Sequence, residues 1–161
     1  MAKKYISILV ANHAGVLARV ASLFNQRGFN IDSLTVSATN NEEVSRITVS
    51  CDVDDSSLYQ ILKQTGKLYE TEKIFELKVS NSLLRELLLV KVRADAQNRH
   101  ELRDIADIFK AKIIDLSPDS MVFELTGEPE KIDGFLEVLK PYEILEMCRT
   151  GATALERGWN D

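Results

Sequence analysis

Four segments of this chain carry apolar residues at the spacing i, i+3, i+4, i+7, which lines one face of an α-helix. Such a face needs burial, so each segment predicts an amphipathic helix packed on another layer. Short runs rich in β-branched residues lie between the segments and predict the strands of that layer. The four stripes are Leu17, Val20, Ala21 and Phe24; Leu58, Ile61, Leu62 and Thr65; Leu102, Ile105, Ala106 and Phe109; and Ile132, Phe135, Leu136 and Leu139.

The predicted strands and helices follow the same order, β-α-β-β-α-β, in both halves of the chain. Residues 31–38 and 44–51 alternate small polar with apolar side chains, as half-buried strands do, and Asn40-Asn41 indicates a hairpin between them. We therefore predict an α+β fold of two tandem ferredoxin-like βαββαβ domains, each a four-stranded antiparallel sheet with two helices on one face. The predicted strands are residues 4–11, 31–38, 44–51, 70–78, 86–94, 112–117, 120–126 and 142–149.

The repeat also sets the expected domain boundaries within the 161 residues. We expect a first domain at residues 1–78, a short linker at 79–82 and a second domain at 83–161. Residues 83–92 would also suit a helix, so both readings of that segment stay open. The polar tail at residues 152–161 is expected to be solvated.

Boundary residues support the predicted helices. Gly28 is expected to end the first helix in a left-handed conformation, and Asp54 to cap the second helix. Pro129 suits the first turn of the fourth helix, because its missing N–H has no intrahelical partner there.

The polar faces of the alternating strands are expected to turn away from the helices. Serine, threonine and Arg46 on these faces would suit solvent or a second packed sheet. A single open sheet also exposes its edges, and proteins pair or cover such edges. We therefore expect the chain to associate with itself.

Composition narrows the possible partners. Hydrophobic residues make up 45% and charged residues 28%, which is compatible with a buried core, and the formal net charge is −5. Net acidity disfavours nucleic-acid binding, where neutralised phosphates supply much of the affinity. The longest apolar run, residues 87–90, is too short to span a bilayer, and the N-terminal residues lack a signal-peptide pattern. We expect a cytoplasmic protein with no nucleic-acid or membrane partner.

Motifs for catalysis and metal binding are missing from the sequence. His13 and His100 have no partner at metal-ligand spacing, and Cys51 and Cys148 lie in apolar runs that favour burial. The seven glycines form no dinucleotide-binding, phosphate-binding or nucleophile-elbow motif. We therefore expect no catalytic residue, no metal site and no cofactor in this chain.

The loop between the first strand and the first helix is a candidate ligand site. The free N–H groups at a helix N-terminus bind carboxylates or phosphates, and Gly15 lets the backbone approach a ligand closely. Asn12 can donate and accept, which suits an α-amino group beside a carboxylate. The structural alternative is that Asn12 caps the helix and Gly15 only makes the turn.

A long run through this loop, from Asn12 to Val36, resembles the N-terminal ACT domain of the small regulatory subunit of acetolactate synthase (acetohydroxyacid synthase). The run reads NHAGVLARVASLFNQRGFNIDSLTV. The second half is similar to the C-terminal domain of the same family, so the resemblance covers nearly the whole chain. The segments that carry this second similarity are residues 85–92, 115–120, 131–136 and 149–151.

The resemblance implies a small amino acid bound between two copies of the domain. ACT domains pair side by side, with the ligand between the first-helix loop of one copy and the start of the second strand of the other. The implied ligand is valine, with leucine or isoleucine as alternatives. Ala14 is a departure, because the family commonly has proline or serine there. The implied ligand-binding residues are Asn12, Ala14, Gly15, Val16 and Leu17 on the loop side, and Asn30 and Ile31 on the facing side.

The resemblance also implies a role without catalysis by this chain. The small subunit binds the catalytic large subunit, which carries thiamine diphosphate, Mg²⁺ and often FAD. It raises the activity of that subunit and confers feedback inhibition by valine in branched-chain amino-acid biosynthesis.

Three alternatives remain. A stand-alone ACT-type amino-acid sensor would regulate a different enzyme. An RNA-binding domain of the same element order would need aromatic residues on the exposed sheet face, where Arg46, Thr48 and Ser50 are expected. A ferredoxin-like metal chaperone would need a Cys-x-x-Cys motif, which this sequence lacks.

Overall fold

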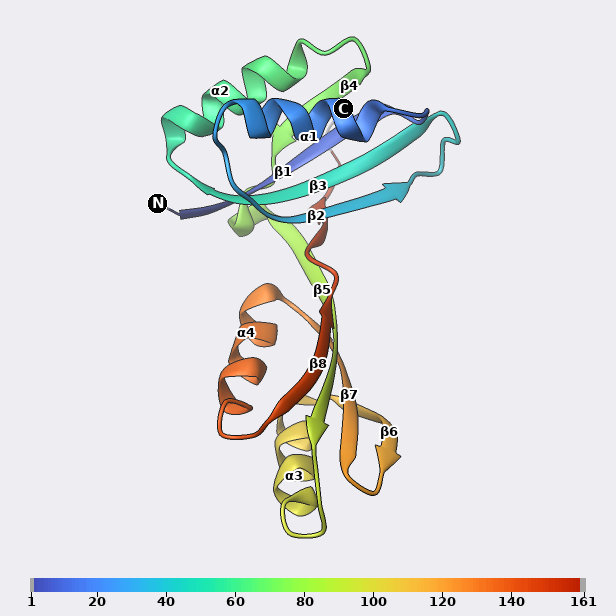
Figure 1. Ribbon diagram of the computed structural model, residues 1–161. Helices are drawn as coiled ribbons and strands as arrows, with labels where there is room; N and C mark the ends of the chain where they lie inside the picture. Colours follow the sequence, from blue (N-terminus) through green and yellow to red (C-terminus); the bar gives the residue numbers. More distant parts are fainter. Residues whose placement is uncertain (1, 160–161) are drawn as a thin grey trace. The chain divides into compact units, whose positions relative to one another are not determined.

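The computed structural model describes residues 2–159, except for the side chain of Ala2, and divides into two compact units (Figure 1). The first unit holds the described residues up to Leu83 together with those from Ala152 onward, and the second unit is Leu84–Gly151. Within the described residues, no helix is both long and apolar enough to cross a membrane.

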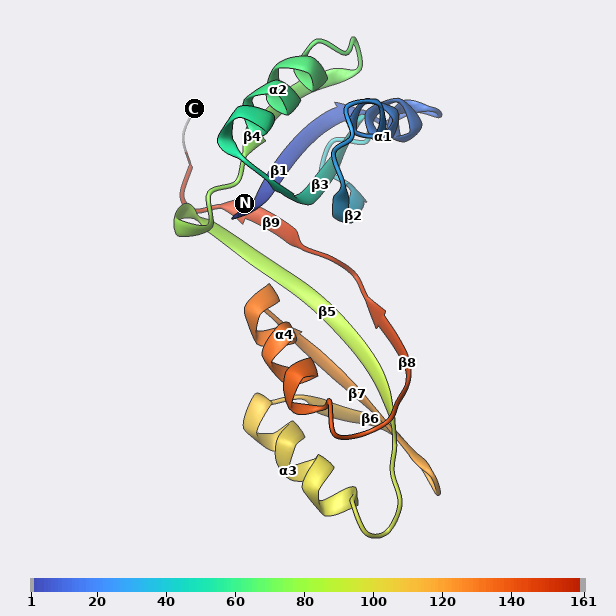
Figure 2. The same cartoon turned by 60° about the vertical axis from the view of Figure 1, so that its left-hand side comes forward.

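The first unit is an antiparallel sheet with two helices on one of its faces (Figures 1 and 2). The strand order is β2-β3-β1-β4, so β1 and β3 are central and β2 and β4 are the edges. This is the arrangement expected of a βαββαβ domain. Its elements are β1 (Ala2–Ala11), α1 (Val16–Gln26), β2 (Ile31–Ala38), β3 (Val44–Val53), α2 (Asp55–Gly66) and β4 (Thr71–Glu76).

Alternation along the two central strands forms the core of this unit. Ile8 pairs with Ile47 in the register of β1 with β3, and both side chains are fully buried. Val20 and Phe24 of α1 and Leu58 of α2 belong to the same core cluster. Because burial of one large aliphatic side chain contributes roughly 1.5–3 kcal/mol, this shared apolar layer dominates the stability of the unit.

The opposite face of the sheet is lined with hydroxyl groups, as the alternation predicts. Ser7 pairs with Thr48, which in turn pairs with Thr35 on β2. Ser7 and Thr48 are buried, although the sequence predicts a face that suits solvent or a second sheet. Arg46 donates a hydrogen bond from Nη1 to Ser7 Oγ over 2.6 Å, which gives one of these buried hydroxyl groups a partner.

The second unit repeats the plan with the strand order β6-β7-β5-β8. Its two helices lie on one face of the sheet (Figure 2), and β9, from the last segment of the chain, also pairs with β5. The predicted fold class of two tandem ferredoxin-like domains is confirmed. After β4, the chain continues with a 3-10 helix, η1 (Val79–Asn81), which still belongs to the first unit. It is followed by β5 (Ser82–Arg93), α3 (Arg99–Phe109), β6 (Lys112–Ser117), β7 (Ser120–Gly127), α4 (Pro129–Val138) and β8 (Ile144–Arg149), and finally by β9 (Thr153–Glu156), which belongs to the first unit.

Three expectations about local structure can be compared with this part of the chain. Within the expected linker at residues 79–82, residues 79–81 form a 3-10 turn and Ser82 already belongs to β5. The segment open to two readings is a strand, since buried and exposed residues alternate along β5 with a period of two. The tail is partly structured: it contains β9, where Ala154 is buried, and its residues 160–161 lie outside the described residues.

The core of the second unit is built in the same way. Val90 of β5 pairs with Phe123 of β7, and both are buried. Phe135 of α4 packs edge-to-face on Phe123 and on Phe109 of α3, with ring centroids 6.0 and 5.2 Å apart. Aromatic pairs of this kind add about 0.5–1.5 kcal/mol beyond area burial, so Phe135 ties the sheet to both helices.

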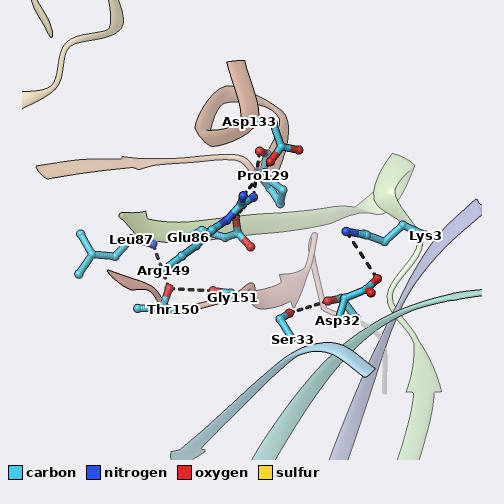
Figure 3. A network of polar contacts seen from close by, with 11 residues as sticks. Lys3, Asp32, Ser33, Glu86, Leu87, Pro129, Asp133, Arg149, Thr150 and Gly151 are labelled. Carbon is cyan, nitrogen blue, oxygen red and sulfur yellow. Dashed lines mark hydrogen bonds and ion pairs between the residues drawn. The ribbon is translucent and has the colours of Figure 1, made fainter. Parts of the chain in front are cut away.

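Arg149, at the end of β8, joins three elements of the second unit (Figure 3). Its guanidinium lies 2.6 Å from Glu86 Oε1 on β5 and 2.7 Å from Asp133 Oδ1 on α4. Burial lowers the pKa of Arg149, but its hydrogen bonds to Asp133 and Glu86 outweigh that effect and raise the pKa above its usual value. The side chain of Glu86 is only 7% exposed, so this ion pair is partly removed from water.

Replacing Arg149 with methionine is expected to lower the free energy of unfolding by about 3 kcal/mol, because the buried Glu86 carboxylate loses its partner. Urea-induced unfolding of the full chain measures this change. The control is Lys140→Met, which removes an ion pair with Glu137 that is exposed on both sides and should cost far less. Equal losses in the two variants would contradict the role given to Arg149.

Candidate functional site

Asn12 anchors the loop that follows β1. Its main-chain N–H donates to the carbonyl of Glu43 over 2.8 Å, and its side-chain Nδ2 donates to the carbonyl of Glu42 over 3.0 Å. Both acceptors lie in the turn between β2 and β3. Asn12 therefore ties the loop to this hairpin and does not cap α1, contrary to the structural alternative.

Gly15 is the turn residue from which α1 begins. Its φ of 88° lies in the left-handed region, and it occupies the N-cap position of the helix. Among the described residues, no side chain caps this end, so the first N–H groups of α1 and the positive end of its dipole face outward. Ala14 and Gly15 are both exposed beside them. This geometry suits the carboxylate of a small molecule.

Val16 and Leu17 have opposite environments. The side chain of Val16 is 3% exposed and belongs to the core, so only its main chain can meet a ligand. The helical stripe predicts burial of Leu17, but this prediction is wrong, because Leu17 is 41% exposed. α1 buries Val16, Val20 and Phe24 instead, at steps of one turn. Leu17 thus leaves an apolar surface beside the helix N-terminus.

Asn30 and Ile31 lie at the opposite end of α1. The helix ends as predicted at a left-handed Gly28, with the N–H of Phe29 donating to the carbonyl of Phe24 over 3.0 Å. Asn30 is exposed, and Ile31 is half-buried at the start of β2. α1 has 11 residues with a rise of 1.5 Å each, so the helix is roughly 16 Å long. This length separates the loop residues at its start from Asn30 and Ile31, which follow its end. One chain therefore does not bring the loop residues together with Asn30 and Ile31.

Two charged residues next to the loop, Arg19 and Glu70, are not among the site residues predicted from sequence motifs. Nε of Arg19, in the first turns of α1, lies 2.6 Å from Oε1 of Glu70, which comes just before β4. The pair is far apart in sequence, and no spacing rule connects a helix residue to a loop residue so distant. Only the fold brings them together.

A shallow depression between α1 and α2 lies away from the loop. It contains none of the predicted ligand-binding residues, and its lining mixes apolar side chains with amides and one arginine. We therefore keep the candidate site at the start of α1. The lining residues of the depression are Leu23, Phe24, Arg27, Phe29, Gln60, Ile61, Gln64 and Thr65.

Cys51 is buried in the core of the first unit. Burial, together with the nearby carboxylates of Asp32 and Asp52, raises the pKa of Cys51 to about 11. A thiol that stays protonated at neutral pH is a poor nucleophile and a poor metal ligand. Within residues 2–159, no group of three or more His, Cys, Asp or Glu side chains is placed to hold a metal ion.

Comparison with known proteins decides the family. A model described as the small subunit of acetolactate synthase matches residues 85–158, and one described as an AHAS small subunit-like ACT domain matches residues 6–73. The acetolactate synthase small subunit of Mycolicibacterium smegmatis is 48% identical over 95% of this chain and 90% of that protein. The chain belongs to the acetolactate synthase small-subunit family.

Other relatives extend this match over the whole small subunit. A probable acetolactate synthase small subunit of Archaeoglobus fulgidus is 45% identical over 97% of this chain and 98% of that protein. The crystal structure of the acetolactate synthase small subunit from Thermotoga maritima covers all of both chains with a TM-score of 0.89 at 37% identity. The matched segments fall inside the expected domains at residues 1–78 and 83–161, whose limits stay a prediction.

The two cysteines of this small subunit are expected to differ in reactivity. The expected burial is confirmed for Cys51 but wrong for Cys148, which is exposed and should react with a thiol reagent in the folded chain at mildly alkaline pH. Cys51 should react only after unfolding, because its thiol is buried and its pKa is about 11. Colorimetric titration should find one reactive thiol in the native chain and two in denaturant. The control Cys148→Ser should abolish the native reaction, and a persisting reaction would contradict the burial of Cys51.

Proposed function

We propose that this chain is the regulatory subunit that binds and activates the catalytic large subunit of acetolactate synthase and confers feedback inhibition by valine. Family membership supports the role, and one geometric observation supports the effector site. That observation is the start of α1 at a left-handed Gly15, with uncapped N–H groups beside exposed Ala14. The carboxylate of an α-amino acid is the group that such a helix end binds.

The effector site in this proposal is completed by a second copy of the chain. β2 is an edge strand, and its Val36 is 45% exposed. Pairing of two β2 edges would satisfy the open backbone groups of both strands. It would also carry Asn30 and Ile31 of one copy toward the loop of the other, which one chain alone does not do. The separation of the proposed site residues within one chain supports a homodimer through the ACT domains.

Selectivity in the proposed site comes from apolar surfaces. Leu17 on the loop side and Ile31 on the facing side would contact the branched side chain of valine. One methylene in such a pocket is worth about 1–3 kcal/mol, so leucine and isoleucine are expected to bind as weaker effectors. Valine can inhibit only by binding one state of the complex better than the other, and a coupling of ~1–3 kcal/mol suffices for feedback.

Catalysis in this proposal belongs entirely to the large subunit. That subunit would carry thiamine diphosphate, Mg²⁺ and FAD, and the two subunits would meet in the cytoplasm. The present chain would contribute no catalytic residue, and its surfaces would be used for the effector and for the two kinds of protein partner.

The decisive experiment combines the purified chain with the catalytic large subunit. The expected result is a higher specific activity than that of the large subunit alone, and loss of the increase on addition of valine. Binding of valine to the chain, measured by isothermal titration, without any effect on the synthase would instead indicate a stand-alone ACT-type sensor of another enzyme. Neither binding nor activation would refute both roles.

Asn30→His and Gly15→Asp are each expected to abolish valine inhibition while activation of the large subunit is kept. In Gly15→Asp, a side chain at the left-handed position strains the turn from which α1 begins, and the new carboxylate would lie next to the guanidinium of Arg19, where it would repel the effector carboxylate. Histidine at position 30 would crowd the facing side of the site. Inhibition curves measure the change, and we expect the valine concentration for half-inhibition to rise by at least about tenfold.

Asn25→His is the matched control, because Asn25 is exposed on α1 and is not one of the predicted ligand-binding residues. It should leave the inhibition curve unchanged. Retained valine inhibition in Asn30→His or Gly15→Asp would overturn the site assignment.

A further inference from the structure

Glu70 is bonded to both ends of the segment that contains the proposed effector loop. Its main-chain carbonyl accepts a hydrogen bond from the N–H of Ala11, the last residue of β1, over 2.9 Å. Its carboxylate Oε1 lies 2.6 Å from Nε of Arg19 in α1. The loop therefore leaves β1 at one contact with Glu70 and enters α1 just before another. One residue thus limits how far the two ends of the loop can separate.

Arg19 also contacts the turn of the loop directly. Its N–H donates to the carbonyl of Gly15 over 3.1 Å, and its Nη1 lies 3.4 Å from the position that a Cβ would take on Gly15. The guanidinium thus packs against the residue whose left-handed conformation starts the helix. Any movement of the Arg19 side chain changes the surroundings of Gly15.

The burial of this ion pair is unequal. The side chain of Glu70 is 14% exposed, whereas that of Arg19 is 48% exposed. A pair with one partner largely removed from water is screened less than a fully exposed pair, so its geometry is better defined. The loop at residues 12–15 contains no proline that would restrict its backbone. Side-chain contacts must therefore supply part of its preorganisation.

We propose that Arg19 and Glu70 are positioning residues, which act as a clamp that holds the loop at residues 12–15 in the conformation that binds the effector amino acid. This inference rests on the proposed function of the loop. The clamp adds no contact to the ligand in this account. It raises the fraction of chains whose loop is in the conformation that binds the effector, and the apparent Kd for the effector falls as that fraction rises.

The test uses Glu70→Gln, Arg19→Gln and the double variant in the full chain. Gln at position 70 keeps the shape and the main-chain carbonyl but removes the charge, so the tie to Ala11 should persist. Isothermal titration with valine should show a Kd about fivefold higher in each single variant, which is about 1 kcal/mol. The double variant should be no weaker than either single variant, because the two groups act as one unit.

Three controls separate positioning from general destabilisation. Lys4→Gln removes another ion pair of the same unit, with Asp55 at 3.1 Å, and should leave the Kd for valine unchanged. Arg19→Lys keeps the charge and should recover part of the affinity. The order of affinity among valine, isoleucine and leucine should stay the same in every variant, because the apolar contacts are untouched.

Amide hydrogen exchange gives a second measurement that does not need the effector. Exchange at residues 13–16 should speed up in Glu70→Gln and Arg19→Gln but not in Lys4→Gln. Wild-type affinity for valine in both single variants would overturn the clamp while leaving the effector site intact. If the wild-type chain bound no branched-chain amino acid, the proposed effector site itself would fail, and unchanged exchange in the variants would refute positioning of the loop separately.

Discussion

The alternation of side chains along the central strands is the constraint on which the rest of each unit depends. In the first unit, β1 and β3 pair so that Ile8 and Ile47 share one face while Ser7 and Thr48 share the other. A slip of one residue would exchange the two faces and place hydroxyl groups under the helices. The register is therefore strongly fixed, and with it the point where β1 ends and the loop begins. The candidate site inherits its position from the packing of the core.

The same constraint explains which parts of the fold could be predicted from sequence. Period-two runs and helical stripes indicate burial locally, so the order of helices and strands along both units follows from them. Gly28 and Asp54 have local chemistry at the helix ends, and both behave as expected: Gly28 is left-handed and Asp54 accepts a hydrogen bond from Ser57 over 2.7 Å. The exposure of Leu17 could not be predicted in this way, because Leu17 fits the stripe, whereas α1 buries the row Val16, Val20 and Phe24.

The features that could not be predicted from sequence depend on contacts between residues that are far apart in the chain. β9 forms in a polar tail because β5 is long enough to pair with it as well as with β8, which the tail itself does not encode. The candidate site divides in the same way. Asn12, Gly15 and Asn30 stand out in one continuous motif, but the contact of Arg19 with Glu70 exists only after β1, α1 and β4 have come together. The local sequence is therefore enough to identify the loop, whereas the ion pair that contacts it can be found only in the folded structure.

The two contacts of Glu70, a main-chain hydrogen bond and a side-chain ion pair, depend differently on the amino acid at position 70. The carbonyl that accepts from Ala11 is supplied by any amino acid at that position, so this tie survives every substitution that leaves the backbone in place. The bond to Arg19 needs an acidic side chain opposite a basic one. When a substitution removes the acidic side chain at position 70, a basic side chain at position 19 no longer has this ion-pair partner. We expect these two positions to change together during descent, while the strand contact beside them persists unaltered.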